Sequence, residues 1–297
     1  MKKLERNLGL TSVISISIGA MLGSGLFVLP GIAYTKTGPS VWLAYLLASL
    51  AVVPAALSKS ELASAMPTSG GTYIYLERTF GPLVGTVSGL GLWLSLLLKC
   101  ALALVGFGAY LEVISNFDFL PASLSMLGLI TLLNIIGTGK VSKSLLFIVS
   151  ITIAIILILE VSSISYFDEN LMKDLFPKGV SGLFQATSLV FISYAGVTKV
   201  AAIAEEIKNP EKNIPRGILV SLFIVTGLYC SATFVLAGTF NYDQLSNNIK
   251  PIYDLGRLVS GEKGALTIAV VAILCMASMA NAGILASSRF PFAMARD

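Results

Sequence analysis

Two apolar stretches of the chain are interrupted near their midpoints, and the residues at these interruptions could bind a solute. The first stretch, residues 11–30, contains Gly23, Ser24 and Gly25, and the second carries its interruption at residues 191–196. A helix in lipid has to satisfy its own backbone N–H and C=O groups, so a break at this depth is costly. It is tolerated where the freed groups line a cavity, and the sequence therefore predicts a binding site at each break.

The peptide groups at the first break could serve both charges of a dipolar solute. The half-helix that follows the break begins with unpaired N–H groups at the positive end of its dipole, which favours an anion. A carboxylate can accept hydrogen bonds from the amides of Ser24 and Gly25, while the carbonyls of Ala20 and Met21 suit an ammonium group. An α-amino acid carries both groups and is the predicted solute. The second break is expected to contribute Phe191, Ile192, Ser193, Tyr194, Ala195 and Gly196.

Several of these residues also have a purely structural interpretation. Glycines such as Gly23 and Gly25 let helices pack closely. The aromatic side chains of Phe191 and Tyr194 could fill a core, although we expect them to form a pocket wall or gate. The Ser193 hydroxyl can bond either a substrate or its own helix backbone. The occurrence of two breaks in one chain favours the binding interpretation.

Lys99 is a cation near the middle of a third apolar stretch, where a charge is expensive and usually functional. We hypothesise that it faces the substrate cavity, either as a cation beside the substrate or as a titrating group that couples transport to protons. The structural alternative is a bond to a carbonyl or to a loop carboxylate. Lys199 is expected to extend to the membrane interface or to pair with Glu205.

The composition places the chain in a membrane and argues against catalysis. Of its 297 residues 55% are apolar and only 12% are charged, with a mean hydropathy of +0.85, whereas soluble domains carry about 25% charged residues. The net charge of +4 lies mostly in short loops and does not indicate nucleic acid binding. The chain contains no His, its three Cys are isolated in apolar runs, and no nucleophile–base pair or phosphate-binding loop is present. We therefore expect neither an enzyme nor a metal site.

Eight apolar stretches are long enough to cross the roughly 30 Å hydrocarbon core as helices. Most Lys and Arg near their ends fall on the side of the N-terminus, which predicts that both termini are cytoplasmic in a multi-pass protein of the cell membrane. The expected spans lie at about 11–35, 41–65, 83–112, 121–138, 142–164, 181–204, 215–239 and 264–291.

The order of the breaks predicts an internal repeat. The first and sixth spans are both discontinuous but run in opposite directions, so the two units are inverted, as in secondary transporters. Residues 1–164 form the first unit with five helices, and residues 165–297 form a partial second unit with three, within one integral membrane domain.

Five motifs in order along the chain resemble those of the amino acid–polyamine–organocation (APC) permeases. They lie at residues 18–27, 67–73, 194–196, 205–210 and 288–297. The resemblance implies an all-α membrane protein with the LeuT-type five-plus-five inverted repeat, and substrate bound at the two breaks. Because members of the family continue beyond the last motif, the fold is expected to be incomplete here, with the chain truncated after the eighth helix.

These observations predict a permease that moves amino acids across the membrane by alternating access. Neutral or broad substrate specificity is expected, because no acidic residue is placed in the site by the spans present. No cofactor is expected, and the coupling ion, H⁺ or Na⁺, stays open, as does the oligomeric state. The alternatives are a non-transporting truncated remnant and a channel or receptor-like membrane protein, although no repeated pore-lining group is visible.

Overall fold

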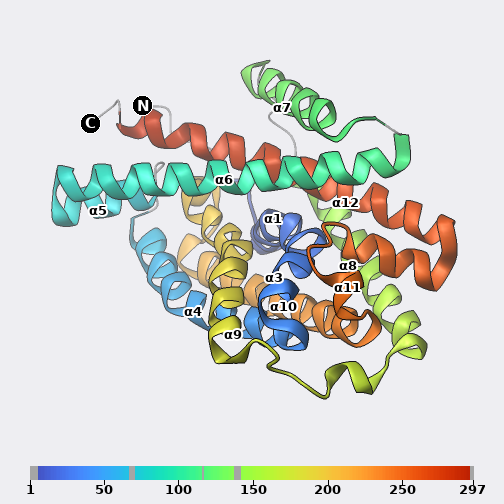
Figure 1. Ribbon diagram of the computed structural model, residues 1–297. Coiled ribbons are helices and arrows are strands. Elements are labelled where there is room, and N and C mark those ends of the chain that lie inside the picture. Colours follow the sequence, from blue (N-terminus) through green and yellow to red (C-terminus); the bar gives the residue numbers. More distant parts are fainter. Residues whose placement is uncertain (1–5, 67–70, 116, 137–141, 295–297) are drawn as a thin grey trace.

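The computed structural model describes residues 6–66, 71–115, 117–136 and 142–294, and within these ranges the chain is built from helices (Figure 1). Parts of two predicted motifs, residues 67–70 and 295–297, therefore lie outside the described residues. The elements up to the predicted repeat boundary are α1 (Leu10–Met21), α2 (Ser24–Phe27), α3 (Leu29–Thr37), the 3-10 helix η1 (Gly38–Ser40), α4 (Val41–Ala65), α5 (Thr72–Phe80), α6 (Pro82–Ser115), α7 (Phe119–Ile136) and α8 (Ser142–Ser163).

The rest of the chain continues the helical pattern and ends in a long bent helix. Its elements are the 3-10 helices η2 (Ile164–Tyr166) and η3 (Glu169–Met172), then α9 (Gly179–Val190), the 3-10 helix η4 (Phe191–Glu206), α10 (Pro210–Thr239), α11 (Tyr242–Leu245) and α12 (Pro251–Met294). The helix α12 bends at Gly261, where φ is 65°. It begins at Pro251, well before residue 264, the predicted start of the eighth span, and the segment before the bend was not predicted.

Six helical stretches of the described residues are long and apolar enough to cross a membrane, and two further apolar helices are shorter. The sequence predicted eight crossings, and the difference arises at the first, second and fourth spans. The first predicted span is divided: its beginning forms the short helix Leu10–Met21, and its end belongs to the long stretch Leu29–Ala65, which also contains the second predicted span. The fourth predicted span corresponds to the shorter helix Phe119–Ile135. The six long stretches are Leu29–Ala65, Pro82–Ser115, Leu146–Tyr166, Gly179–Ala201, Pro210–Thr239 and Pro251–Ser288.

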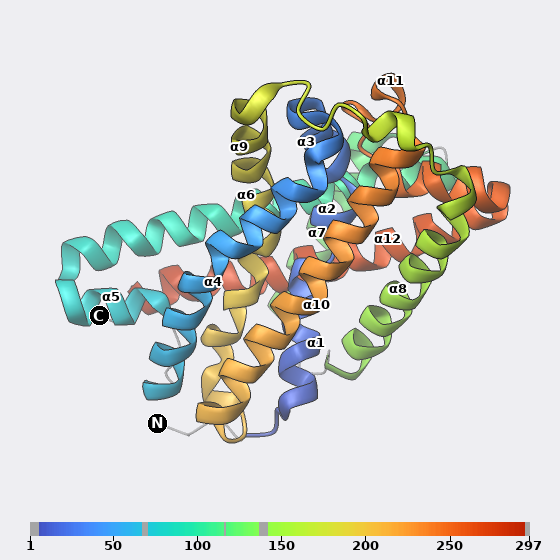
Figure 2. The same ribbon diagram turned by 90° about the horizontal axis from the view of Figure 1, so that it is seen from below.

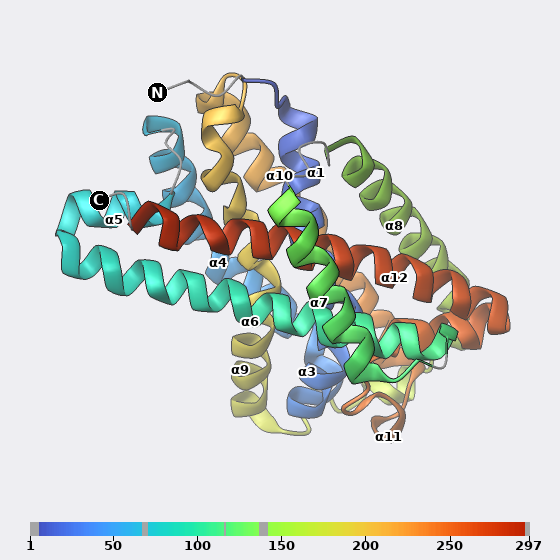
Figure 3. The ribbon, with the colours of Figure 1, turned by 90° about the horizontal axis from the view of Figure 1, so that it is seen from above.

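The interrupted helix α1 lies at the centre of the bundle. It packs against α8, α10 and η4, and α4 packs against both α10 and η4. Figure 2 shows the gold segment that follows α9 lying between α4 and α10. The helices α6 and α12 run side by side across one face of this bundle (Figure 3). The two predicted breaks are therefore brought together in the interior, although more than 160 residues separate them.

The burial pattern is that of a protein surrounded by an apolar solvent. Large apolar side chains on outer helix faces are exposed, for example Leu83 on α6 at 80% and Phe223 on α10 at 82%. The interior instead holds polar groups, including Lys99, Ser24 and Ser193, each at most 2% exposed. Polar groups that are kept away from lipid and gathered around a break are the expected signature of a functional membrane interior.

Candidate substrate site at two interrupted helices

The first helix is interrupted where the sequence predicted it. Leu22 N donates to Ile18 O at 2.7 Å, whereas Leu26 N and Phe27 N both donate to Gly23 O at 3.0 Å. Gly23 itself is extended, with φ 165° and ψ −126°. The regular series of backbone hydrogen bonds along the helix is therefore interrupted between Leu22 and Leu26. In the described part of the chain, no well-formed backbone hydrogen bond uses the amides of Ser24 and Gly25.

Buried tyrosines satisfy the carbonyls that the interruption frees. Tyr229 Oη on α10 donates to Met21 O at 2.7 Å, and Tyr45 Oη on α4 donates to Gly25 O at 2.7 Å. Next along the chain, Tyr110 Oη on α6 donates to Phe27 O at 2.9 Å. All three side chains are fully buried. Since a buried carbonyl without a partner is costly, these hydroxyls stabilise the irregular backbone.

The second interruption is a change of helix type. The α-helix α9 ends at Val190 and the chain continues as the 3-10 helix η4, which is longer than 3-10 helices usually are. Two side-chain hydrogen bonds join η4 to other elements. Lys99 Nζ on α6 donates to Ser193 O at 3.1 Å, and Tyr194 Oη donates to Tyr45 O at 3.1 Å. The second break is thus tied to α6 and α4.

The two interruptions pack directly against each other. A Cβ added to Gly25 would lie 2.5 Å from Tyr229 Oη and 2.8 Å from Ser193 Cβ, and one added to Gly196 would collide with the backbone carbonyl of Ala20. Both positions therefore require glycine in this arrangement. The Ser193 hydroxyl is buried near the Tyr45 hydroxyl, but it has no hydrogen-bond partner among the described residues.

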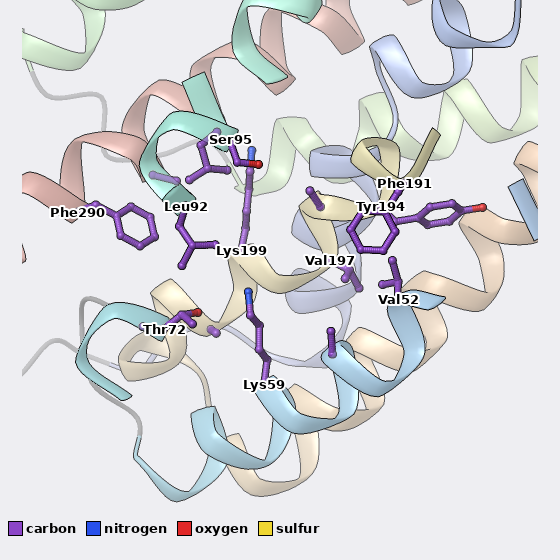
Figure 4. Close-up of a pocket in the computed structure, with 16 residues that line it drawn as sticks. Val52, Lys59, Thr72, Leu92, Ser95, Phe191, Tyr194, Val197, Lys199 and Phe290 are labelled. Carbon is purple, nitrogen blue, oxygen red and sulfur yellow. The ribbon is translucent and has the colours of Figure 1, made fainter. Parts of the chain in front are cut away.

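A cavity of about 200 Å³ adjoins the second interruption (Figure 4). Phe191, Tyr194 and Ala195 form part of its wall, and the cations Lys59 and Lys199 also line it. None of the predicted residues at the first interruption lines this cavity. Those residues are fully buried, namely Ala20, Met21, Gly23, Ser24 and Gly25.

The remaining predicted side chains fall in different places. Ile192 is partly buried and does not line the cavity, while Ser193 and Gly196 are buried against the first interruption. Lys99 lies beside the cavity wall rather than in it, with its ammonium group on the Ser193 carbonyl. The Glu205 side chain, which was the predicted partner of Lys199, lies outside the described part of the chain.

Sequence reasoning missed the tyrosines that cap the first break. Tyr45, Tyr110 and Tyr229 each interrupt an apolar span with a hydroxyl that has to be paired when it is buried. These three hydroxyl groups within apolar spans could have indicated a polar interior from the sequence alone. Their partners were not predictable, because the pairing joins α1 and α2 to three helices distant in the sequence.

Comparison with known proteins assigns a family to this arrangement. Residues 12–297 match the family described as amino acid permease. The methylthioribose transporter of Bacillus subtilis (strain 168) is 32% identical over an alignment that covers 100% of this chain and 68% of the relative. A branched-chain amino acid permease of the same organism is 29% identical, with the same 100% and 68% coverage.

Another relative, which matches a smaller part of the chain, comes from a plant. The chloroplastic cationic amino acid transporter 7 of Arabidopsis thaliana is 30% identical over 82% of this chain and 46% of the relative. The names of these three relatives describe three different solutes. The comparisons therefore define a family of solute carriers, and they leave the individual substrate of this chain open.

Proposed function

Since the chain belongs to the amino acid permease family of multi-pass membrane transporters, we propose that it carries an amino acid across the cell membrane by alternating access. Members of this family are transporters, not enzymes. The observation that supports the proposal most is the pairing of two interrupted helices in the protein interior, with Gly25 against Ser193 and Gly196 against Ala20. Such pairs are where secondary transporters bind substrate.

We place the substrate zwitterion between the two interruptions. The amides of Ser24 and Gly25 would receive the carboxylate, because they lack backbone partners in the described part of the chain. The carbonyls of Ala20 and Met21, with those of the second interruption, would receive the ammonium group. Phe191 and Tyr194 would separate this site from the neighbouring cavity, as their place in the cavity wall supports.

The packing indicates a conformation in which this site is closed. Tyr229 and Ser193 occupy the space beside Gly25, so substrate can enter only after α10 or η4 moves away from α2. During that movement the ammonium group would replace the Tyr229 hydroxyl on Met21 O. This exchange of one donor for another keeps the buried carbonyl hydrogen-bonded throughout the movement. Alternating access requires such an exchange where water is excluded from the interior, because no water then replaces a lost donor.

The remaining parts of the proposal follow the inverted-repeat scheme. Residues 1–164 and 165–297 would be the two units, with eight crossings and both termini in the cytoplasm. Lys99 is the coupling candidate, because it joins the two units through Ser193 O. The ion that drives transport is H⁺ or Na⁺. A neutral amino acid is the favoured substrate, since neither interruption, at residues 20–25 or 191–196, contains an Asp or Glu.

Uptake of labelled leucine into proteoliposomes tests the proposal, because one relative is a branched-chain amino acid permease. We expect uptake by the protein, competed by other neutral amino acids, and its loss in Gly25→Ala. The matched control is Gly227→Ala on α10, where an added methyl group meets nothing within 4 Å. Absence of uptake and of binding for every neutral amino acid would contradict the proposed substrate class. Equal uptake by Gly25→Ala and the control would contradict the proposed site.

A further inference from the structure

Glu160 is an acidic side chain enclosed within an apolar helix. It belongs to α8 and lies in the stretch Leu146–Tyr166, which is long enough to cross a membrane. Its neighbours Ile158 and Val161 are 65% and 68% exposed on the outer face of this helix, whereas Glu160 is turned inward and is only 8% exposed. A carboxyl group at such a position is costly and is usually functional. The proposed zwitterion site does not use it.

One hydroxyl group of α10 lies beside this carboxyl group. Ser231 Oγ is 3.1 Å from Glu160 Oε1 and 3.2 Å from the backbone oxygen of Leu228. A serine hydroxyl has a single proton, whereas an ionised carboxylate and a carbonyl can only accept, so Ser231 cannot donate to both oxygens at once. If Glu160 carries a proton, it can donate to Ser231 Oγ while Ser231 donates to Leu228 O. The geometry therefore favours the protonated carboxyl group.

Among the described residues, no cation pairs with Glu160. The salt bridge found there joins Arg257 to Glu262. Lys143, the other charged residue of α8, is the second residue of that helix and lies about 25 Å along it from Glu160. Arg289 lies about 21 Å along α12 beyond Cys275, the residue that contacts Thr152 of α8. An ionised Glu160 would thus be a buried charge without a partner in this part of the chain, which is unfavourable.

The elements packed against α8 are chiefly α1, α10, α12 and η2, and α1 contains no ionisable residue. The charged residues of α10 lie in its first two turns, far from Ser231. The other described ionisable groups of these elements have contacts elsewhere or are exposed: Tyr229 with Met21 O, Cys230 with Trp42 O, Cys275 with Thr152, Tyr253 with Tyr110, Asp254 with Asn248, and the exposed Tyr166 and Lys263.

We propose that Glu160 binds the proton that drives transport, so that its carboxyl group is protonated in this closed conformation and ionised when α10 moves away from α8. The proton is taken from water and returned to water. Its loss leaves a buried charge, which favours separation of the two helices and access of water to the carboxylate.

The position of Ser231 on α10 connects this proton site to the substrate site, and this part of the proposal rests on the proposed function. Tyr229, two residues before Ser231, donates to Met21 O at the first interruption. A movement of α10 therefore breaks the contact with Glu160 and the contact with the first interruption together. Lys99 holds the second interruption through Ser193 O and would act beside Glu160, not in its place.

Leucine transport by proteoliposomes, with the membrane potential held at zero, tests the role of this proton. If one proton accompanies each leucine, a gradient of about one pH unit drives about tenfold accumulation. Glu160→Gln keeps the size of the side chain but cannot release a proton. We expect it to lose accumulation and to retain exchange of internal for external leucine, which also shows that it is folded. Glu169→Gln, at an exposed acid of η3, should keep both activities.

Infrared difference spectroscopy of the purified protein detects the proton without any need for transport. We expect a signal of a protonated carboxyl group that disappears in Glu160→Gln. The signal should shift in Ser231→Ala, because the carboxyl group then loses its hydrogen bond to Ser231 Oγ. Ser163→Ala is the matched control, since the Ser163 hydroxyl donates to the main-chain oxygen of Glu160 and not to its carboxyl group.

The two measurements separate this proposal from the proposed function. If leucine is transported but Glu160→Gln still accumulates it, if a Na⁺ gradient alone drives accumulation, or if the infrared signal is absent, the proton site is overturned and amino acid transport stands. If the signal is present and is lost in Glu160→Gln while no neutral amino acid is transported, the proton site stands and the proposed function is wrong.

Discussion

The hydroxyl of Tyr229, on α10, donates a 2.7 Å hydrogen bond to the main-chain oxygen of Met21, the last residue of α1. In an uninterrupted helix the amide of Gly25 would occupy this oxygen. A side chain from a helix 208 residues further along the chain has taken its place. The interruption is therefore stabilised by tertiary contacts, and a movement of α10 relative to α1 has to break this hydrogen bond.

Tyr229→Phe should destabilise the substrate-free protein by about 1–3 kcal/mol, because it leaves Met21 O buried without a donor. If the substrate ammonium group takes over this carbonyl, leucine should restore part of the lost stability. The thermal shift produced by leucine should then be larger in Tyr229→Phe than in the unsubstituted protein. Thermal unfolding in detergent, with and without leucine, measures both quantities.

Tyr110→Phe is the matched control for this prediction. It removes a similar hydrogen bond, from Tyr110 to Phe27 O, outside the proposed site. We expect it to lose comparable stability and to show no increase in the leucine shift. An equal leucine shift in both variants would mean that Met21 O does not contact substrate.

Gly196→Ala should abolish leucine uptake, because the added methyl group would collide with the backbone carbonyl of Ala20. A backbone atom cannot rotate away as a side chain can, so η4 and α1 would have to separate. We expect a loss of about 1–3 kcal/mol in stability, as for other overpacked interiors. Gly91→Ala on α6, where the methyl group meets nothing within 4 Å, is the control. Uptake by Gly196→Ala at the control rate would show that close contact of the two interruptions is dispensable.

The position of the first interruption could be predicted from the sequence because it depends on local chemistry. Gly23, Ser24 and Gly25 weaken a helix wherever they stand together in a span, and α1 ends two residues before Gly23. The second interruption was predicted at the correct residue, Phe191, but its form was not. A 3-10 helix depends on packing against α1, α4 and α10, which no local pattern encodes.

The wall of the cavity was the least predictable part of the site. The notable cation in the sequence was Lys99, because it lies deep in an apolar span, yet the structure places it on Ser193 O outside the cavity wall. Lys59 and Lys199 lie nearer the ends of their spans, where long side chains ordinarily extend to the interface. Both line one cavity because α4 packs against η4.

Lys99→Met should flatten the dependence of leucine uptake on external pH if Lys99 couples transport to protons. The substitution keeps the length of the side chain and removes both its charge and its hydrogen bond to Ser193 O. Uptake by proteoliposomes between pH values of about 5 and 8 measures the profile, with the exposed Lys36→Met as control. A lower rate with an unchanged pH profile would restrict Lys99 to holding the Ser193 carbonyl.

Ser193→Ala distinguishes a substrate ligand from a packing residue at the second interruption. The Ser193 hydroxyl is buried and has no hydrogen-bond partner among the described residues. Its removal should therefore leave stability within about 1 kcal/mol of the original or increase it, since an unsatisfied polar group is lost. If the hydroxyl bonds the substrate once the site opens, leucine binding should weaken about tenfold. Titration of leucine by isothermal calorimetry, beside unfolding measurements on the same sample, gives both values, and unchanged binding would remove Ser193 from the proposed substrate contacts.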